Sequence, residues 1–184
     1  FPTRPLPSCG NATFAMQNGE YMLKDSESFD CLINASGNCT KKQIRIITIL
    51  DFMGVKQTQK TIWRINGMRG DKCEIALKTE SVLTQRDEAR VQELLGQQMT
   101  EEEIEANVDM IQEGFDVLVG ARGLCHIEAK TFSNILTRWK DRGYQGGARC
   151  SVDENNELIC TFAGGWSFAE ECVGTYFKPM VGVG

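Results

Sequence analysis

The chain has 184 residues, of which 41% are hydrophobic and 24% are charged, so it can bury a core and is neither disordered nor of low complexity. Its 25 acidic residues outnumber its 20 Lys and Arg residues, and this net charge of -5 argues against nucleic acid as the main partner. No apolar run approaches the roughly 20 residues of a membrane-spanning helix, so no transmembrane anchor is expected. With His126 as the single histidine, neither a metal site nor a cofactor is predicted.

The first part of the chain is predicted to form an extended N-terminal arm followed by strands. Residues 1–10 contain three prolines and lead into Cys9, which predicts an extended N-terminal arm tied down by a disulfide. Residues 41–79 are predicted to form strands, and the segment QIRIITIL (43–50) is apolar on both faces, which predicts burial on both sides. Strands over 60–65 and 72–79 flank a loop at 66–71, so we expect a hairpin there.

A helical segment is predicted over residues 84–142. It comprises a short helix capped by Thr84, a longer helix that starts at the Thr100 and Glu103 capping box and ends near Gly120, and a third helix over 131–140. A second hairpin follows over residues 148–162. We therefore expect an α+β fold: a single disulfide-stabilised domain over residues 1–184, with a helical insertion packed on an antiparallel sheet.

The cysteines indicate where the protein folds. There are eight of them, without any CxxC spacing, and this favours disulfides over a zinc or redox site: Cys9, Cys31, Cys39, Cys73, Cys125, Cys150, Cys160 and Cys172. Proximity in the sequence suggests the pairs Cys31–Cys39 and Cys150–Cys160. Because disulfides persist in oxidising compartments, and because the chain begins at Phe1 as after removal of a signal peptide, we predict a secreted, extracellular protein.

Three Asn-x-Ser/Thr sequons lie within the first forty residues, at Asn11, Asn34 and Asn38. Such sequons accept N-linked glycans in secreted proteins, and a glycan must face solvent. The sequence therefore predicts a glycoprotein whose N-terminal region runs over the surface.

Charge is unevenly distributed along the chain. Residues 41–72 carry eight basic and two acidic side chains, whereas residues 73–117 carry three basic and twelve acidic ones. One interpretation is an acidic helix face that attracts a basic sheet within the fold. The other is a basic patch that binds an anionic glycan or protein partner.

The tripeptide Arg69-Gly70-Asp71 lies in the predicted hairpin loop, just before Cys73. It matches the motif that extracellular integrin ligands use, and its display at a hairpin tip is similar to that in disintegrins. This resemblance implies that the Asp carboxylate completes a metal site on the receptor and that the Arg guanidinium enters an acidic pocket. A disulfide at Cys73 would lower the entropy lost when a receptor grips the loop.

Other segments suggest different chemistry. His126 lies near Glu128, and a histidine beside a carboxylate can act as a general base, but the sequence contains no recognisable nucleophile motif to accompany it. The run Glu101, Glu102 and Glu103 fits the first turn of a helix better than paired-carboxylate catalysis, and residues 153–157 fit a turn better than a calcium loop. Aromatic residues that form a core or line a pocket for a small apolar ligand are Trp63, Trp139, Phe162, Trp166, Phe168, Tyr176 and Phe177.

The leading hypothesis is a non-enzymatic secreted glycoprotein that binds an extracellular protein or cell-surface receptor, with an integrin as the candidate partner of Arg69, Gly70 and Asp71. It acts either as an adhesion ligand or as an antagonist. The alternatives are a carrier for a small apolar ligand in a cleft between sheet and helices, a secreted protein inhibitor, and a hydrolase that uses His126.

Overall fold

The computed structural model describes residues 5–17, 20–52, 54–96, 99–116, 118–146, 148–152, 158–162 and 171–177, with the backbone alone described for 52, 148–152 and 158–162. The helices are α1 (Glu27–Gly37), α2 (Glu88–Leu95), α3 (Glu101–Asp116) and α4 (Ala129–Arg142). The strands are β1 (Ser8–Gln17), β2 (Glu20–Leu23), β3 (Lys42–Phe52), β4 (Val55–Arg69), β5 (Lys72–Arg86), β6 (Arg122–Ile127), β7 (Ala148–Val152), β8 (Leu158–Phe162) and β9 (Cys172–Val173).

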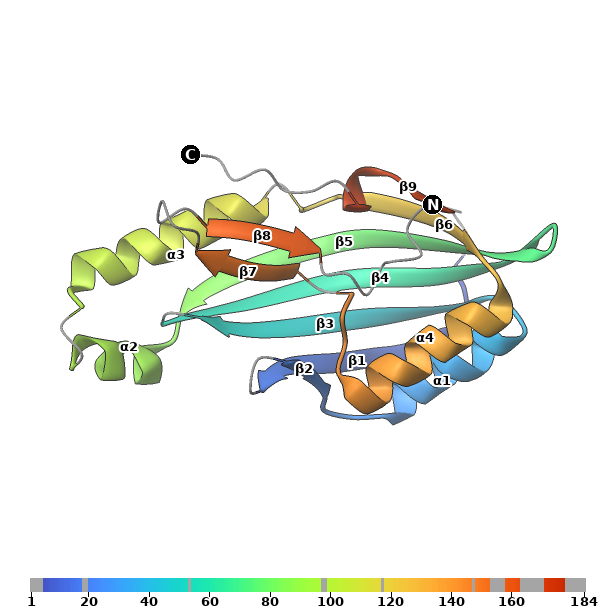
Figure 1. Ribbon diagram of the computed structural model, residues 1–184, viewed down its shortest axis with the longest axis horizontal. Helices are drawn as coiled ribbons and strands as arrows, with labels where there is room; N and C mark the ends of the chain where they lie inside the picture. Colours follow the sequence, from blue (N-terminus) through green and yellow to red (C-terminus); the bar gives the residue numbers. More distant parts are fainter. Residues whose placement is uncertain are drawn as a thin grey trace.

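Seven strands form one sheet in the order β2-β1-β3-β4-β5-β6-β9 (Figure 1). Every neighbouring pair is antiparallel except β1 and β3, which run parallel with α1 in the connection between them. Strands β7 and β8 form a separate antiparallel ribbon, in which Cys150 lies opposite Cys160. The predicted α+β class with a mostly antiparallel sheet is thus confirmed. None of the helices in the described ranges has the length and apolar composition needed to cross a bilayer.

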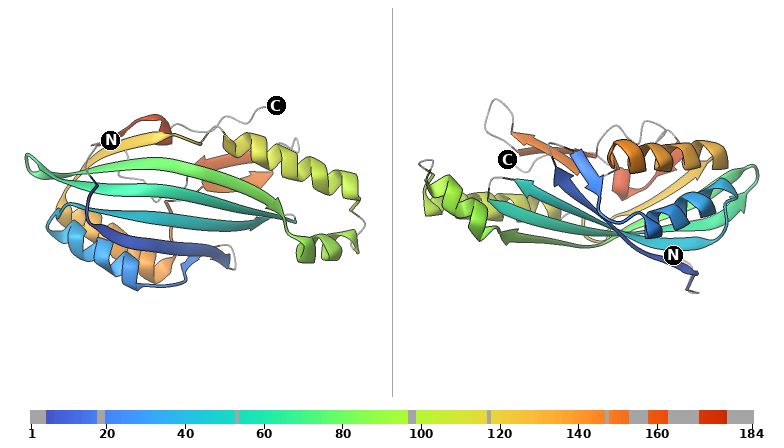
Figure 2. Two further views of the ribbon diagram at one scale, coloured as in Figure 1. Left: turned by 180° about the vertical axis from the view of Figure 1, so that it is seen from behind. Right: turned by 90° about the horizontal axis from the view of Figure 1, so that it is seen from below.

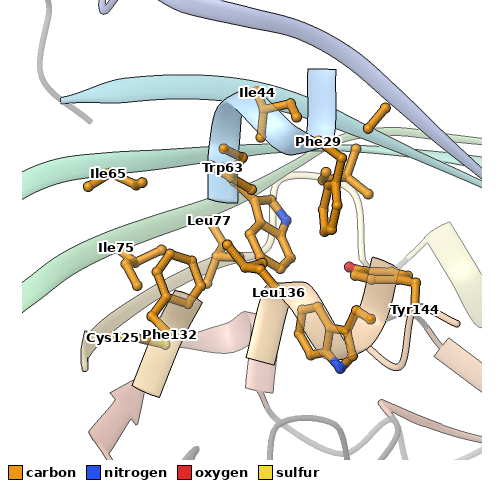
Figure 3. Packing of buried hydrophobic residues seen from close by; sticks show 14 of the residues in the cluster. Phe29, Ile44, Trp63, Ile65, Ile75, Leu77, Cys125, Phe132, Leu136 and Tyr144 are labelled. Atoms are coloured by element: carbon orange, nitrogen blue, oxygen red, sulfur yellow. The ribbon is translucent and has the colours of Figure 1, made fainter. Parts of the chain in front are cut away.

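Helices α1 and α4 pack against each other and cover one face of the sheet (Figure 1). Alternate residues of β3, β4 and β5 point into this layer, so Ile44, Trp63 and Ile75 are almost fully buried. Trp63 meets Trp139 of α4 edge-on, with ring centroids 5.9 Å apart, and Tyr144 packs beside both (Figure 3). This cluster of large side chains is the main core of the fold.

The opposite side of the sheet, which we call the open face, has neither α1 nor α4 over it (Figure 2, left). It carries the other alternate residues of β3 to β6. Ile47 and Ile49 are only half-buried there, so residues 43–50 are buried on the helix side and fall short of the expected burial on the other side. The reason is that the helices cover only one side of the sheet, while cationic side chains share the open face with these isoleucines.

Element boundaries differ from the expected ones between residues 79 and 128. Strand β5 continues to Arg86, and α2 is capped by Asp87, whose Oδ1 accepts from the Arg90 amide at 3.3 Å, rather than by Thr84. Strand β6 interrupts the expected helical segment. The capping box is confirmed: the Thr100 amide donates to Glu103 Oε2 at 2.7 Å, and the Glu103 amide donates to Thr100 Oγ1 at 3.2 Å.

Among the side chains that the structure describes, three disulfides stabilise the fold: Cys9–Cys31, Cys39–Cys73 and Cys125–Cys172. The suggested pair Cys31–Cys39 is therefore wrong. Cys31 lies within α1 and Cys39 just beyond its C-terminus, so the rise of the helix separates them by about 12 Å, too far for a bridge. The side chains of Cys150 and Cys160 lie outside the described residues, and that pairing stays a prediction.

Candidate functional site

The Arg69-Gly70-Asp71 motif lies at a two-residue turn between the long strands β4 and β5. Arg69 ends β4 and Lys72 begins β5, and the two are paired across the ladder, so Gly70 and Asp71 alone form the turn. Gly70 has φ +67°, and open space surrounds the position where a Cβ would lie. A glycine with positive φ at the first central position is typical of the type II′ turn, which matches the twist of a hairpin. We call residues 68–72 the tip.

The expected loop at 66–71 is shorter in the structure because the ladder continues through a bulge. The register shifts between Ile65 and Gly67, and Gly67 has φ +107°. Beyond this bulge, Gly67 pairs with Glu74 and Met68 with Cys73. Bulges increase twist and redirect a strand, so this one sets the direction in which the tip leaves the sheet. Figure 1 shows the tip extending past the other elements at the right.

A disulfide anchors the base of the tip. Cys73, two residues after Asp71, is fully buried and bonded to Cys39, with 5.5 Å between their Cα atoms. Cys39 follows α1, so the bond joins the hairpin to the helical layer. The expected disulfide beside the motif is confirmed, with Cys39 as its partner. It restricts the hairpin from below while leaving residues 69–71 exposed.

The charged groups of the tip differ in their partners. Within the described residues, no hydrogen bond or ion pair engages the exposed Asp71 carboxylate. Arg69 is 74% exposed, and its Nε lies 3.7 Å from Glu74 Oε2, at the long end of the ion-pair range. Lys72 Nζ donates to Glu171 Oε1 at 2.7 Å, and this hydrogen bond raises the pKa of Lys72.

Glu74 is the centre of a small polar cluster behind the tip. Its Oε1 accepts from Asn66 Nδ2 at 3.0 Å, and its Oε2 lies 3.4 Å from His126 Nε2 as well as near Arg69. The side chain of Glu74 is only 18% exposed, so this carboxylate is held in place. It restrains the position of Arg69 without taking the guanidinium out of solvent.

Of the other candidate residues, His126 belongs to the polar cluster around Glu74, and the acids of α3 lie in another element. His126 contacts Glu74 rather than Glu128, which accepts from Thr131 Oγ1 at 3.4 Å. Among the described residues, no hydroxyl or thiol is hydrogen-bonded to His126. Of the three acids that begin α3, Glu101 pairs with Arg86 at 2.6 Å and Glu103 completes the capping box. No group of three metal-ligating side chains occurs in the ranges that the structure covers.

Trp63, Trp139 and Tyr176 belong to the core, and Phe177 is half-buried beside it. The residues 153–157, Trp166 and Phe168, together with the side chain of Phe162, lie outside the described residues. A hollow of about 370 Å³ is present on the open face between β5, β6 and β9. This geometry tests neither the carrier hypothesis nor the hydrolase hypothesis, and both stay predictions.

The three sequon asparagines are all exposed. Asn11 lies in β1, Asn34 lies in α1, and Asn38 caps the C-terminus of α1. Asn38 precedes Cys39, so this sequon lies next to the disulfide that anchors the tip. All three positions can carry a glycan without displacing core residues.

Two features of the site were missed from the sequence. Met68 is 55% exposed and adds an apolar side chain beside the motif. Glu74 is the partner of Arg69. Side chains alternate along a strand, so the sequence could have placed Glu74 on the same face as Lys72, with Cys73 on the other. No protein family, no curated protein and no solved structure matches this chain, so the geometry of the tip carries the functional argument.

Proposed function

We propose that the protein is an extracellular, disulfide-bonded glycoprotein that binds an integrin through Arg69, Gly70 and Asp71. The observation that carries this proposal is the position of the motif: a two-residue turn, exposed at the end of a hairpin that Cys39–Cys73 anchors. The disulfides and the exposed sequons support an origin in the secretory pathway.

The geometry suits receptor binding for a physical reason. A ligand loop loses conformational entropy when a receptor immobilises it, and that cost weakens binding. In this protein the disulfide and the ladder pairs up to Arg69 and Lys72 have already restricted the loop. The Asp71 carboxylate can then reach a receptor-bound cation, while Arg69 needs to leave only a 3.7 Å ion pair with Glu74.

The experiment compares the wild type with Asp71→Glu in binding to purified integrins and in adhesion of integrin-bearing cells. The substitution keeps the charge and moves the carboxylate by one methylene, so we expect binding to weaken by at least about tenfold. Asp109→Glu makes the same chemical change at an exposed position of α3 and serves as the matched control. A chelator of divalent cations is expected to abolish wild-type binding.

Equal binding by wild type and Asp71→Glu would reject the motif as the contact. Equal loss in Asp71→Glu and Asp109→Glu would show that the effect is not specific to the tip. Both variants change exposed side chains, so near-UV circular dichroism is expected to remain that of the wild type.

A further inference from the structure

We infer that the open face is a binding site for a sulfated polysaccharide, independent of the tip. The inference begins with the strand register. Arg45 of β3 lies opposite Ile62 of β4, Ile62 lies opposite Lys78 of β5, and Lys78 lies opposite Arg122 of β6. The side chains of this row share one face because paired residues of adjacent strands point the same way. We call Arg45, Lys78 and Arg122 the cationic row.

Two more cations border the row on β4: Lys60 and Arg64, two residues to either side of Ile62. Strand spacing places Arg45 and Arg122 about 14 Å apart, so the row crosses the sheet as a band rather than a point. Within the row, Arg45 pairs with Glu80 at 2.5 Å and also donates to Asn11 Oδ1 at 3.4 Å. Glu74, further along β5, is already engaged by Asn66 and His126.

The strand register brings like charges together on this face. Lys78 and Arg122 are directly opposed like charges, which destabilise an antiparallel pair. Within the described residues, no carboxylate is paired with Lys60 or Lys78. The chain as a whole is acidic, with a net charge of -5, so the concentration of five cations on one uncovered face is not a consequence of composition. A bound polyanion would relieve the repulsion.

The surface around the row has two hollows. The one of about 370 Å³ lies at one end, lined by Arg122, Ala76 and Leu124 and bordered by Glu74, which Asn66 and His126 engage. A smaller one of about 50 Å³ lies at the other end, lined by Arg45, Ile62 and the sequon residue Asn11. Aliphatic side chains between cations suit a chain in which anionic groups alternate with the C–H faces of sugar rings. This polymer is also the polyanion class that a protein from an oxidising, extracellular compartment meets.

Nucleic acid fits this face less well. Proteins that bind single strands stack bases on aromatic side chains, and the described side chains of β3 to β6 that point to the open face include His126, which Glu74 engages, but no Phe, Tyr or Trp. Helices α2 and α3, which together carry nine acidic side chains and one basic one, lie at one end of the sheet (Figure 2) and would repel a long rigid duplex.

The test measures binding of the full chain to immobilised heparin at physiological ionic strength, with desulfated heparin, duplex DNA and phosphatidylserine vesicles as further probes. The double variant Lys60→Gln/Lys78→Gln removes two cations of the face. Lys24→Gln/Lys130→Gln removes two exposed lysines outside it and is the matched control. We expect the face variant to bind heparin roughly ten- to thirtyfold more weakly, with a shallower salt dependence, and the control to bind as the wild type does.

A gain-of-function variant completes the design. Glu80→Gln releases Arg45 from its ion pair and is expected to tighten heparin binding severalfold.

Lys78→Gln removes the repulsion with Arg122, so its thermal stability should equal or exceed that of the wild type while its binding falls. Unfolding therefore cannot explain the loss.

Three results would overturn the inference. The first is absence of wild-type binding to heparin, and the second is equal loss in the face and control variants. The third is binding of desulfated heparin, DNA or vesicles as tight as that of heparin, which would replace the proposed ligand class.

Discussion

The Cys39–Cys73 disulfide should contribute both to stability and to receptor binding, and the double variant Cys39→Ala/Cys73→Ala separates the two effects. The bond joins residues 34 positions apart, and the chain-entropy relation then gives a stabilisation of about 3.8 kcal/mol at 25 °C. For a chain of this size, that loss lowers the melting temperature by roughly 8–15 °C. Because the ladder still holds Arg69 opposite Lys72, we expect integrin affinity to fall only about three- to tenfold.

Cys9→Ala/Cys31→Ala is the matched control, because its disulfide spans 22 positions and joins β1 to α1 rather than the hairpin. The same relation gives about 3.4 kcal/mol, so the two variants should lose similar stability. Thermal and urea unfolding followed by circular dichroism measure stability, and surface plasmon resonance with a purified integrin measures affinity. If both variants bind the integrin as the wild type does, the ladder alone orders the tip and the reasoning is refuted.

Two further predictions concern charge and protonation. Glu74→Gln removes the 3.7 Å ion pair of Arg69. Because Arg69 is 74% exposed, we expect at most about a threefold gain in integrin association rate. A loss of binding would instead mean that Glu74 orients the guanidinium for the receptor. Burial raises the pKa of Tyr176 to about 12, above that of a tyrosine in the unfolded chain. The unfolded state therefore ionises first as the pH rises. The contribution of Tyr176 to the free energy of unfolding should fall by about 1.4 kcal/mol per pH unit between pH 10 and 12. Urea midpoints across this range should decline less steeply in Tyr176→Phe, and parallel slopes for both proteins would contradict the assignment.

Local patterns in the sequence were sufficient to predict the hairpin and the capping box. The hairpin rests on alternation around a turn that glycine favours, and the cap rests on Thr100 and Glu103, three residues apart. Both depend on interactions between near neighbours, which a single sequence contains.

The remaining features depend on contacts between distant segments. Helix α1 was not predicted, although Phe29, Leu32 and Ala35 recur on its buried face, and β1 was missed because its partner β3 lies beyond that helix. The disulfide partners follow from the same placement, because α1 separates Cys31 from Cys39 and brings each beside a strand. The cationic row is likewise a product of register, since four strands must align before Lys78 lies opposite Arg122.

The outermost part of β1 affects how copies of the protein meet. Strand β2 pairs with residues 14–17 of β1, so within the described chain the backbone of residues 8–12 faces outward on that side. Such a margin invites strand addition by a second copy, but here a register irregularity between Ser8 and Asn11 bends it, and a glycan on Asn11 would shield it. This edge of the sheet is therefore protected against growth by the addition of strands from other copies.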